Sequence, residues 1–231
     1  MNKKEALMLL MLLCSALALF GCSSITPFSK KNDMPDFNET YILSNQPCSP
    51  PCWQGLTIGS STGDEVLSTL SGLEFVDTNR LVVEKGSFPD FDPKADWVEG
   101  QSILVPCKNQ RRCVDVVIVH DRLRAIIVKP EKGLMLADVI ESFGNPDYLY
   151  PFFITGPSFD CMIEIIWVEK QLSLFSATVG HKEEDIDNCL GVAQDGILPK
   201  DLMIVDIKYL PIEEIHDRLN FQEYAEFQGI K

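Results

Sequence analysis

The chain has 231 residues, of which 45% are hydrophobic and 23% are charged, and its formal net charge at pH 7 is −14. This hydrophobic share is ordinary for a globular protein. Its basic residues form no cluster, so the negative charge repels nucleic acid and anionic lipid headgroups, and we expect no nucleic-acid partner.

The first 21 residues have the zones of a signal peptide. Lys3 and Lys4 precede an almost wholly apolar run of about 15 residues, shorter than the roughly 20 that a permanent membrane-spanning helix needs. The run ends in Leu19-Phe20-Gly21-Cys22, which resembles the lipobox of bacterial lipoproteins, although Phe20 is bulkier than is usual at its position. The resemblance implies cleavage before Cys22, a diacylglycerol on the Cys22 thiol and often an acyl chain such as palmitate on the new amino group. The alternatives are an uncleaved N-terminal anchor and a plain signal peptide with an accidental cysteine.

Cleavage would remove two lysines and one glutamate and change the net charge from −14 to −15. We expect residues 1–21 to be the signal peptide and residues 22–47 the lipidated N-terminus and a flexible tether, rich in polar residues and proline. The lipid would hold the protein on the extracytoplasmic side of the cell membrane or the outer membrane. Ser23 is not the aspartate of an inner-membrane retention signal, which favours the outer membrane where one exists.

Six cysteines follow the tether, and an even count in an exported chain favours disulfides. They are Cys48, Cys52, Cys107, Cys113, Cys161 and Cys189. Of fifteen possible pairings we expect the sequential one, because each bond then closes a local loop. A zinc site and a redox-active pair are weaker alternatives. The spacings of three and five residues differ from the usual two, and Pro50-Pro51 forbids a helix at the first pair.

Thr62-Gly63-Asp64-Glu65 predicts a helix that begins with a capping box and ends near Gly72. The same order of residue types returns at 138–143, where Gly144-Asn145-Pro146 predicts a firm helix end. Strands are predicted at 114–119 and 123–128, at 162–168 and 171–177, and at 203–209. We therefore expect an α+β fold of two tandem helix-plus-antiparallel-hairpin repeats, stapled by disulfides, over residues 48–130 and, with a C-terminal extension, 131–231.

The stretch Leu136-Ala-Asp-Val-Ile-Glu-Ser-Phe143-Gly144-Asn-Pro146-Asp147 resembles the small lipoprotein subunit of the outer-membrane barrel-assembly machinery, the BamE/SmpA type. A tandem pair of such units is similar to the secreted β-lactamase inhibitor protein fold. Pro51-Cys52-Trp53-Gln54-Gly55 is similar to a motif of uncharacterised lipoproteins, which implies no known activity. The first resemblance implies a binding or scaffolding role.

No motif predicts a catalytic site, a metal site or a cofactor. His120 is expected in a solvated turn, His181 in a polar loop and His216 in an amphipathic segment, and none has a serine or cysteine in a recognised nucleophile setting. Asp90, Asp92 and Asp96 have calcium-loop spacing, but Lys94 stands at the fifth position and no glycine at the sixth. The acidic run at 183–187 is expected to be a solvated surface.

Two aromatic clusters are either core residues or, if exposed, a surface for an envelope protein or a glycan. They contain Phe88, Phe91, Trp97, Tyr148, Tyr150 and Phe152. We expect a non-enzymatic binding or assembly module. The alternative is a cell-surface hydrolase or other envelope enzyme, which would need a pocket that gathers acidic residues with a histidine. The roughly 190 residues after the tether are few for a two-lobed transporter subunit.

Overall fold

The computed structural model describes residues 36–38, 40–90, 96–108, 110, 112–154, 160–177, 196–199, 201–221 and 225–230. The chain divides into residues 1–34 and residues 35–231, and every element named below belongs to the second unit. The signal segment and Cys22 lie outside the described residues. Within the described ranges, no helix has both the length and the apolar character needed to cross a bilayer.

The centre of the fold is the predicted hairpin of β5 (Val114–Val119) and β6 (Arg122–Val128). Its turn residues His120 and Asp121 have positive φ angles of 50° and 58°, the mirror-image turn that suits the right-handed twist of the strands. Both strands are buried almost throughout, as their β-branched composition predicts.

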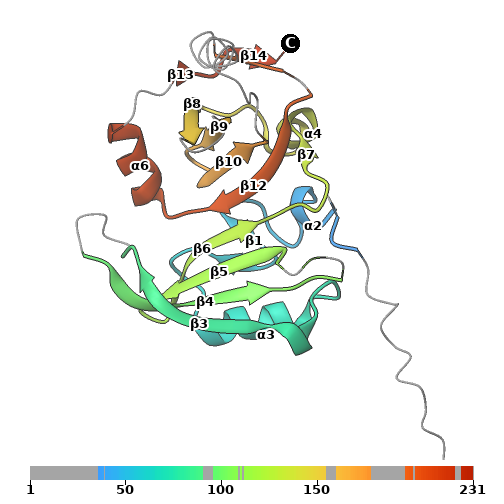
Figure 1. The fold of residues 1–231 in the computed structure, drawn as a ribbon, viewed down its shortest axis with the longest axis vertical. Helices are drawn as coiled ribbons and strands as arrows, with labels where there is room; N and C mark the ends of the chain where they lie inside the picture. Colours follow the sequence, from blue (N-terminus) through green and yellow to red (C-terminus); the bar gives the residue numbers. More distant parts are fainter. Residues whose placement is uncertain are drawn as a thin grey trace, which may run out of the picture. The chain divides into compact units, whose positions relative to one another are not determined.

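Further strands extend this hairpin on both sides into a ten-stranded antiparallel sheet (Figure 1). Beyond β5 lie β4 (Val98–Val105) and then β3 (Val82–Phe88). Beyond β6 lie, in order, β12 (Met203–Tyr209), β10 (Leu172–Ser176), β9 (Asp160–Trp167), β8 (Tyr148–Ile154) and β13 (Ala225–Glu226), while β7 (Leu134–Met135) also pairs with β12.

The expected α+β fold of two helix-plus-hairpin repeats is therefore wrong, because the structure is mostly β with one large sheet. Each predicted hairpin is only part of a longer meander, β3 to β6 or β8 to β12. The meanders join where Ile126 and Val128 of β6 pair with Tyr209 and Ile207 of β12. A free hairpin would leave a row of backbone groups unpaired at a buried edge, so pairing continues across the sheet.

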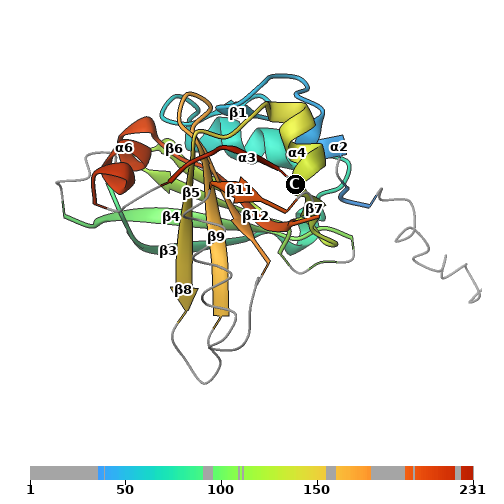
Figure 2. The same cartoon turned by 90° about the horizontal axis from the view of Figure 1, so that it is seen from above.

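Helices cover one face of the sheet. Figure 2 shows α3 (Gly63–Gly72), α4 (Leu136–Phe143), α2 (Thr40–Leu43) and the small hairpin of β1 (Cys52–Trp53) and β2 (Leu56–Thr57) on the same side. The predicted capping box is confirmed, since Thr62 Oγ1 accepts from the Glu65 amide and the Glu65 carboxylate accepts from the Thr62 amide. The end of α4 is also as predicted, because Gly144 has a φ of 78° and donates to the Ile140 carbonyl.

The other face of the sheet carries α6 (Ile212–Phe221). Ile215 of α6 packs with Ala125 and Ile166 in a second hydrophobic cluster. The neighbouring strand residues Ile126 and Ile165 belong instead to the main core under α3 and α4. Because successive strand residues point to opposite faces, α6 lies on the face that α3 and α4 leave open.

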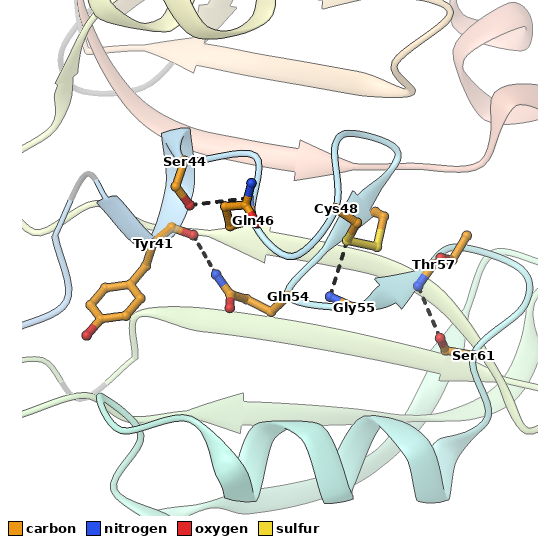
Figure 3. Close-up of a disulfide and its surroundings, with 9 residues drawn as sticks. Tyr41, Ser44, Gln46, Cys48, Gln54, Gly55, Thr57 and Ser61 are labelled. Atoms are coloured by element: carbon orange, nitrogen blue, oxygen red, sulfur yellow. Dashed lines mark hydrogen bonds between the residues drawn. A yellow bond between two sulfur atoms is a disulfide. The ribbon is translucent and has the colours of Figure 1, made fainter.

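The N-terminal part of the described chain packs against the main core through aromatic side chains. Phe37, Tyr41 and Trp53 surround Phe75, with ring centroids 4.4–6.4 Å from it. Figure 3 shows the Gln54 side chain donating to the Tyr41 carbonyl, beside the Cys48–Cys52 bond. The remaining elements are a 3-10 helix at Thr78–Arg80 and a parallel pair of β11 (Ile197–Leu198) with β14 (Gly229–Ile230).

Disulfides join Cys48 to Cys52 and Cys107 to Cys113, two of the three pairs expected from the sequence. Cys161 is also disulfide-bonded, and its partner lies outside the described residues, as does Cys189. The Cys161–Cys189 pair stays a prediction.

Candidate functional site

One edge of the large sheet is open to solvent. Strand β3 is the last strand of the sheet, and its seven residues pair with β4 without a break, from Val82 opposite Leu104 to Phe88 opposite Val98. Every residue of β3 except Phe88 is exposed, on both faces of the strand. The β3–β4 hairpin thus reaches beyond the part of the sheet that α3 covers.

Exposed apolar side chains lie at both ends of this hairpin. Val82 is 45% exposed, Val83 49% and Trp97, directly before β4, 69%. The ring of Phe88 lies over Gly86 and Gly100, where added Cβ atoms would come within 3.3 and 2.9 Å of it. Three of the six large hydrophobic side chains exposed in the described part of the chain therefore belong to this one hairpin.

Strand β3 has few of the features that protect sheet edges in soluble proteins. Such edges are usually short, bulged, interrupted by proline or lined with lysines. The strand has no proline, its register with β4 has no shift, and Lys85 is its one lysine. At the opposite end of the sheet, β13 has only two residues. The backbone groups on the outer side of β3 are placed to receive another strand.

A hollow of about 410 Å³ lies beside this edge, between the beginning of α3 and strands β3 to β5. Its charged lining consists of three exposed carboxylates, Asp64, Glu99 and Asp121, and one ammonium, Lys85. Carboxylates predominate, so the hollow attracts cations; His120 also lines it.

The beginning of α3 is not an anion site, although helix N-termini often are. The Gly63 amide donates to Asp121 Oδ1 at 3.2 Å, the Glu65 amide to Thr62 Oγ1 and the Val66 amide to the Thr62 carbonyl. These donors are already used inside the chain. The three carboxylates therefore decide the electrostatics of the hollow.

His120 lies in the turn between β5 and β6, as expected from the sequence, and its side chain is 60% exposed. Its Nε2 atom is 3.0 Å from Asp90 Oδ2. Within the described residues, no serine, threonine or cysteine is hydrogen-bonded to the ring. The arrangement lacks a nucleophile paired with a base, the minimum that nucleophilic hydrolysis needs.

A second group of charges holds α6 to the sheet. Arg218 Nη1 lies 2.9 Å from Glu164 Oε1 and Arg218 Nη2 lies 2.7 Å from Glu214 Oε1, while Arg124 Nη2 lies 2.7 Å from Glu214 Oε2. Glu164 is almost wholly buried and also accepts a hydrogen bond from the Ser173 hydroxyl. Burial raises the pKa of Glu214, but the attraction of Arg218 and Arg124 outweighs it, so the pKa lies below its ordinary value. These pairs have partners of opposite charge in place, and we assign them a structural role.

The structure does not bring the predicted aromatic surface together. Phe88 and Trp97 lie on the β3–β4 hairpin, whereas the half-buried Tyr148 and Tyr150 lie on β8, near the other end of the sheet. Tyr148 packs against the cluster under α6. Phe91 and the side chain of Phe152 lie outside the described residues.

The remaining histidines and acidic residues considered in the sequence do not form a site in the described part of the structure. His216 is exposed on α6, and His181 and the acidic run at 183–187 lie outside the described residues. Asp90 and Asp96 flank an undescribed stretch that contains Asp92 and Lys94. In the described ranges, no group of three or more histidine, cysteine or acidic side chains could hold a metal ion.

The open edge of β3 was not predicted from the sequence. Its signal is present in retrospect, as Val82-Val83 followed by charged residues and then by the Val98–Val105 segment. Comparison of the chain with known proteins found no matching family model, curated protein or solved structure. The resemblances to lipoproteins and to the barrel-assembly subunit stay predictions.

Proposed function

We propose that the protein is a membrane-anchored extracytoplasmic lipoprotein that acts as a non-enzymatic binding module, accepting an extended segment of an envelope partner protein on the edge of β3. The observation that carries the proposal is the long, regular, solvent-exposed edge strand with Val82, Val83 and Trp97 beside it. Main-chain hydrogen bonds would supply affinity, and the flanking side chains would supply specificity.

The alternative of a cell-surface hydrolase has less support. It would need His120 to act on a substrate in the hollow, but the ring pairs with Asp90 and has no nucleophile beside it among the described residues.

The membrane anchor rests on the sequence of residues 1–22. Metabolic labelling of cells with an alkyne analogue of palmitate tests it directly. We expect label on the parent protein and none on Cys22→Ser. Label that persists in the variant would contradict the assignment.

The binding edge is tested by a photo-crosslinking amino acid placed in turn at Val83, at Trp97 and, as a control, at Met135. Met135 is also an exposed apolar residue, at 44%, but lies on β7. We expect one protein to crosslink from both positions on the β3–β4 hairpin and not from β7. The adduct should disappear when Val82→Lys is added, because a lysine on an edge strand opposes strand addition. Equal crosslinking at Met135, or none at the hairpin, would contradict the proposal.

A further inference from the structure

The charges beside β3 indicate which kind of segment the edge would accept. Val83 pairs with Ile103, which belongs to the main core, so Val83, Lys85 and Ser87 share the face of the sheet that α3 covers elsewhere. The hollow opens on this face, since Lys85, Glu99 and Gln101 line it. A strand added to β3 would therefore place every second side chain toward the hollow.

The net charge around the hollow beside β3 is negative. Asp64 lies at the beginning of α3, Asp121 in the turn between β5 and β6, and Glu99 on β4. Lys85 lies opposite Gln101 and diagonal to Glu99, so it offsets one of the three carboxylates. Glu84 lies on the opposite face of β3, where it interacts with the Arg112 guanidinium, so it does not face the hollow.

An anion and a metal ion are both poorer occupants than an organic cation. Three of the first four amide groups of α3, those of Gly63, Glu65 and Val66, already donate within the chain, so the helix start offers little to an anion. The described carboxylates do not form a group that could hold a metal ion. A flexible side chain with a terminal positive charge fits an open hollow of about 410 Å³ that is lined mainly by carboxylates.

We propose that the occupant of the β3 edge is an extended, cationic segment of a partner protein, with a lysine or arginine side chain in the hollow lined by Asp64, Glu99 and Asp121. This inference rests on the proposed function and adds the chemistry of the partner. The net charge of −15 expected after removal of residues 1–21 would also speed the approach of such a segment at low ionic strength.

Three fluorescent nine-residue peptides test this proposal against purified residues 23–231 with intact disulfides. The first alternates lysine with threonine or valine, the second has glutamate in place of each lysine, and the third keeps the lysines but has every main-chain amide N-methylated. By fluorescence anisotropy we expect the first peptide to bind at least ten-fold more tightly than either of the others. N-methylation removes the main-chain donors while it leaves the charge unchanged.

Reversal of the charge at Glu99 tests whether the lysine peptide binds at the hollow. We expect Glu99→Lys to weaken binding of the first peptide about ten-fold, because it replaces an attraction by a repulsion. Glu141→Lys is the matched control, since Glu141 is exposed on α4 and the change in net charge is the same. Circular dichroism of both variants checks that the fold is kept.

Each outcome decides the inference. Equal weakening by Glu99→Lys and Glu141→Lys would show a nonspecific charge effect and overturn it. Tighter binding of the glutamate peptide, or no binding of any peptide, would also overturn it. The crosslinking from Val83 and Trp97 decides the proposed function separately, because it does not depend on the charge of the partner.

Discussion

Replacement of Arg218 by methionine should destabilise the protein, because the buried carboxylate of Glu164 would lose its ion pair with Arg218. Glu164 is 2% exposed, and after the substitution the Ser173 hydroxyl would still donate to it. Loss of one member of a buried pair typically costs about 3–5 kcal/mol. The Arg218 side chain is 29% exposed, so water can reach part of the vacated site, and we expect about 3 kcal/mol.

The double variant Glu164→Gln/Arg218→Met removes both charges and should cost only about 1 kcal/mol relative to the parent. Urea unfolding followed by circular dichroism measures both losses. The single substitution should lower the melting temperature by roughly 6–12 °C, at about 2–4 °C per kcal/mol for a unit of this size. Arg80→Met, which breaks the more exposed pair with Asp77, is the control and should cost about 1 kcal/mol or less.

This prediction fails if Arg218→Met costs less than about 1 kcal/mol, because Glu164 would then be adequately stabilised without Arg218. It also fails if the double variant is as unstable as the single one. In that case the loss would come from packing of the arginine stem and not from an isolated charge.

Three further results are expected. Glu214 has a lowered pKa in the folded state. Its contribution to the free energy of unfolding is therefore present above its unfolded pKa of about 4.3 and is lost as the pH falls through the folded pKa. In urea titrations, the difference in stability between the parent and Glu214→Gln should shrink below about pH 4. Thr62→Ala should cost about 1 kcal/mol by the same assay, whereas no loss would show that the capping box at α3 contributes little. Gly100→Ala should lower the melting temperature measurably, because its Cβ would lie 2.6 Å from the Ile118 carbonyl oxygen.

Elements with strong local signals were predictable from the sequence. Strand β12 has the predicted bounds, Met203–Tyr209, and β5 and β6 match their β-branched runs. The capping box of α3 was also predictable, because it depends on Thr62 and Glu65 alone. In each case, residues close in the sequence determine the structure.

The strands that were not predicted have no local pattern of apolar and polar residues that indicates a strand. Strand β3 is exposed on both faces, so it has no alternation of apolar and polar residues. Strand β8 contains Pro151, a residue that argues against a strand within a sheet. Only Tyr148 and Leu149 of β8 pair with β13, so the missing amide of Pro151 does not interrupt that pairing. The pairing of β6 with β12 joins residues far apart in the sequence, and the periodicity of apolar residues cannot predict such a long-range contact.

The candidate site was less predictable than the fold. The aromatic clusters suggested one surface, yet the sheet places Trp97 and Tyr150 near opposite ends. The hollow depends on Asp64, Glu99 and Asp121, which come from three elements and meet only when the sheet and α3 are assembled. No spacing in the sequence relates these three positions.

Amide hydrogen exchange across β3 tests the central claim most directly. Purified residues 23–231 would be measured by mass spectrometry with and without the alternating lysine peptide at saturating concentration. We predict slower exchange in a fragment that covers Val82–Phe88, with no change in α4, because an added strand would take up the outer amide groups of β3. Unchanged exchange in β3, with the peptide shown to be bound, would contradict the claim that this edge accepts a partner strand.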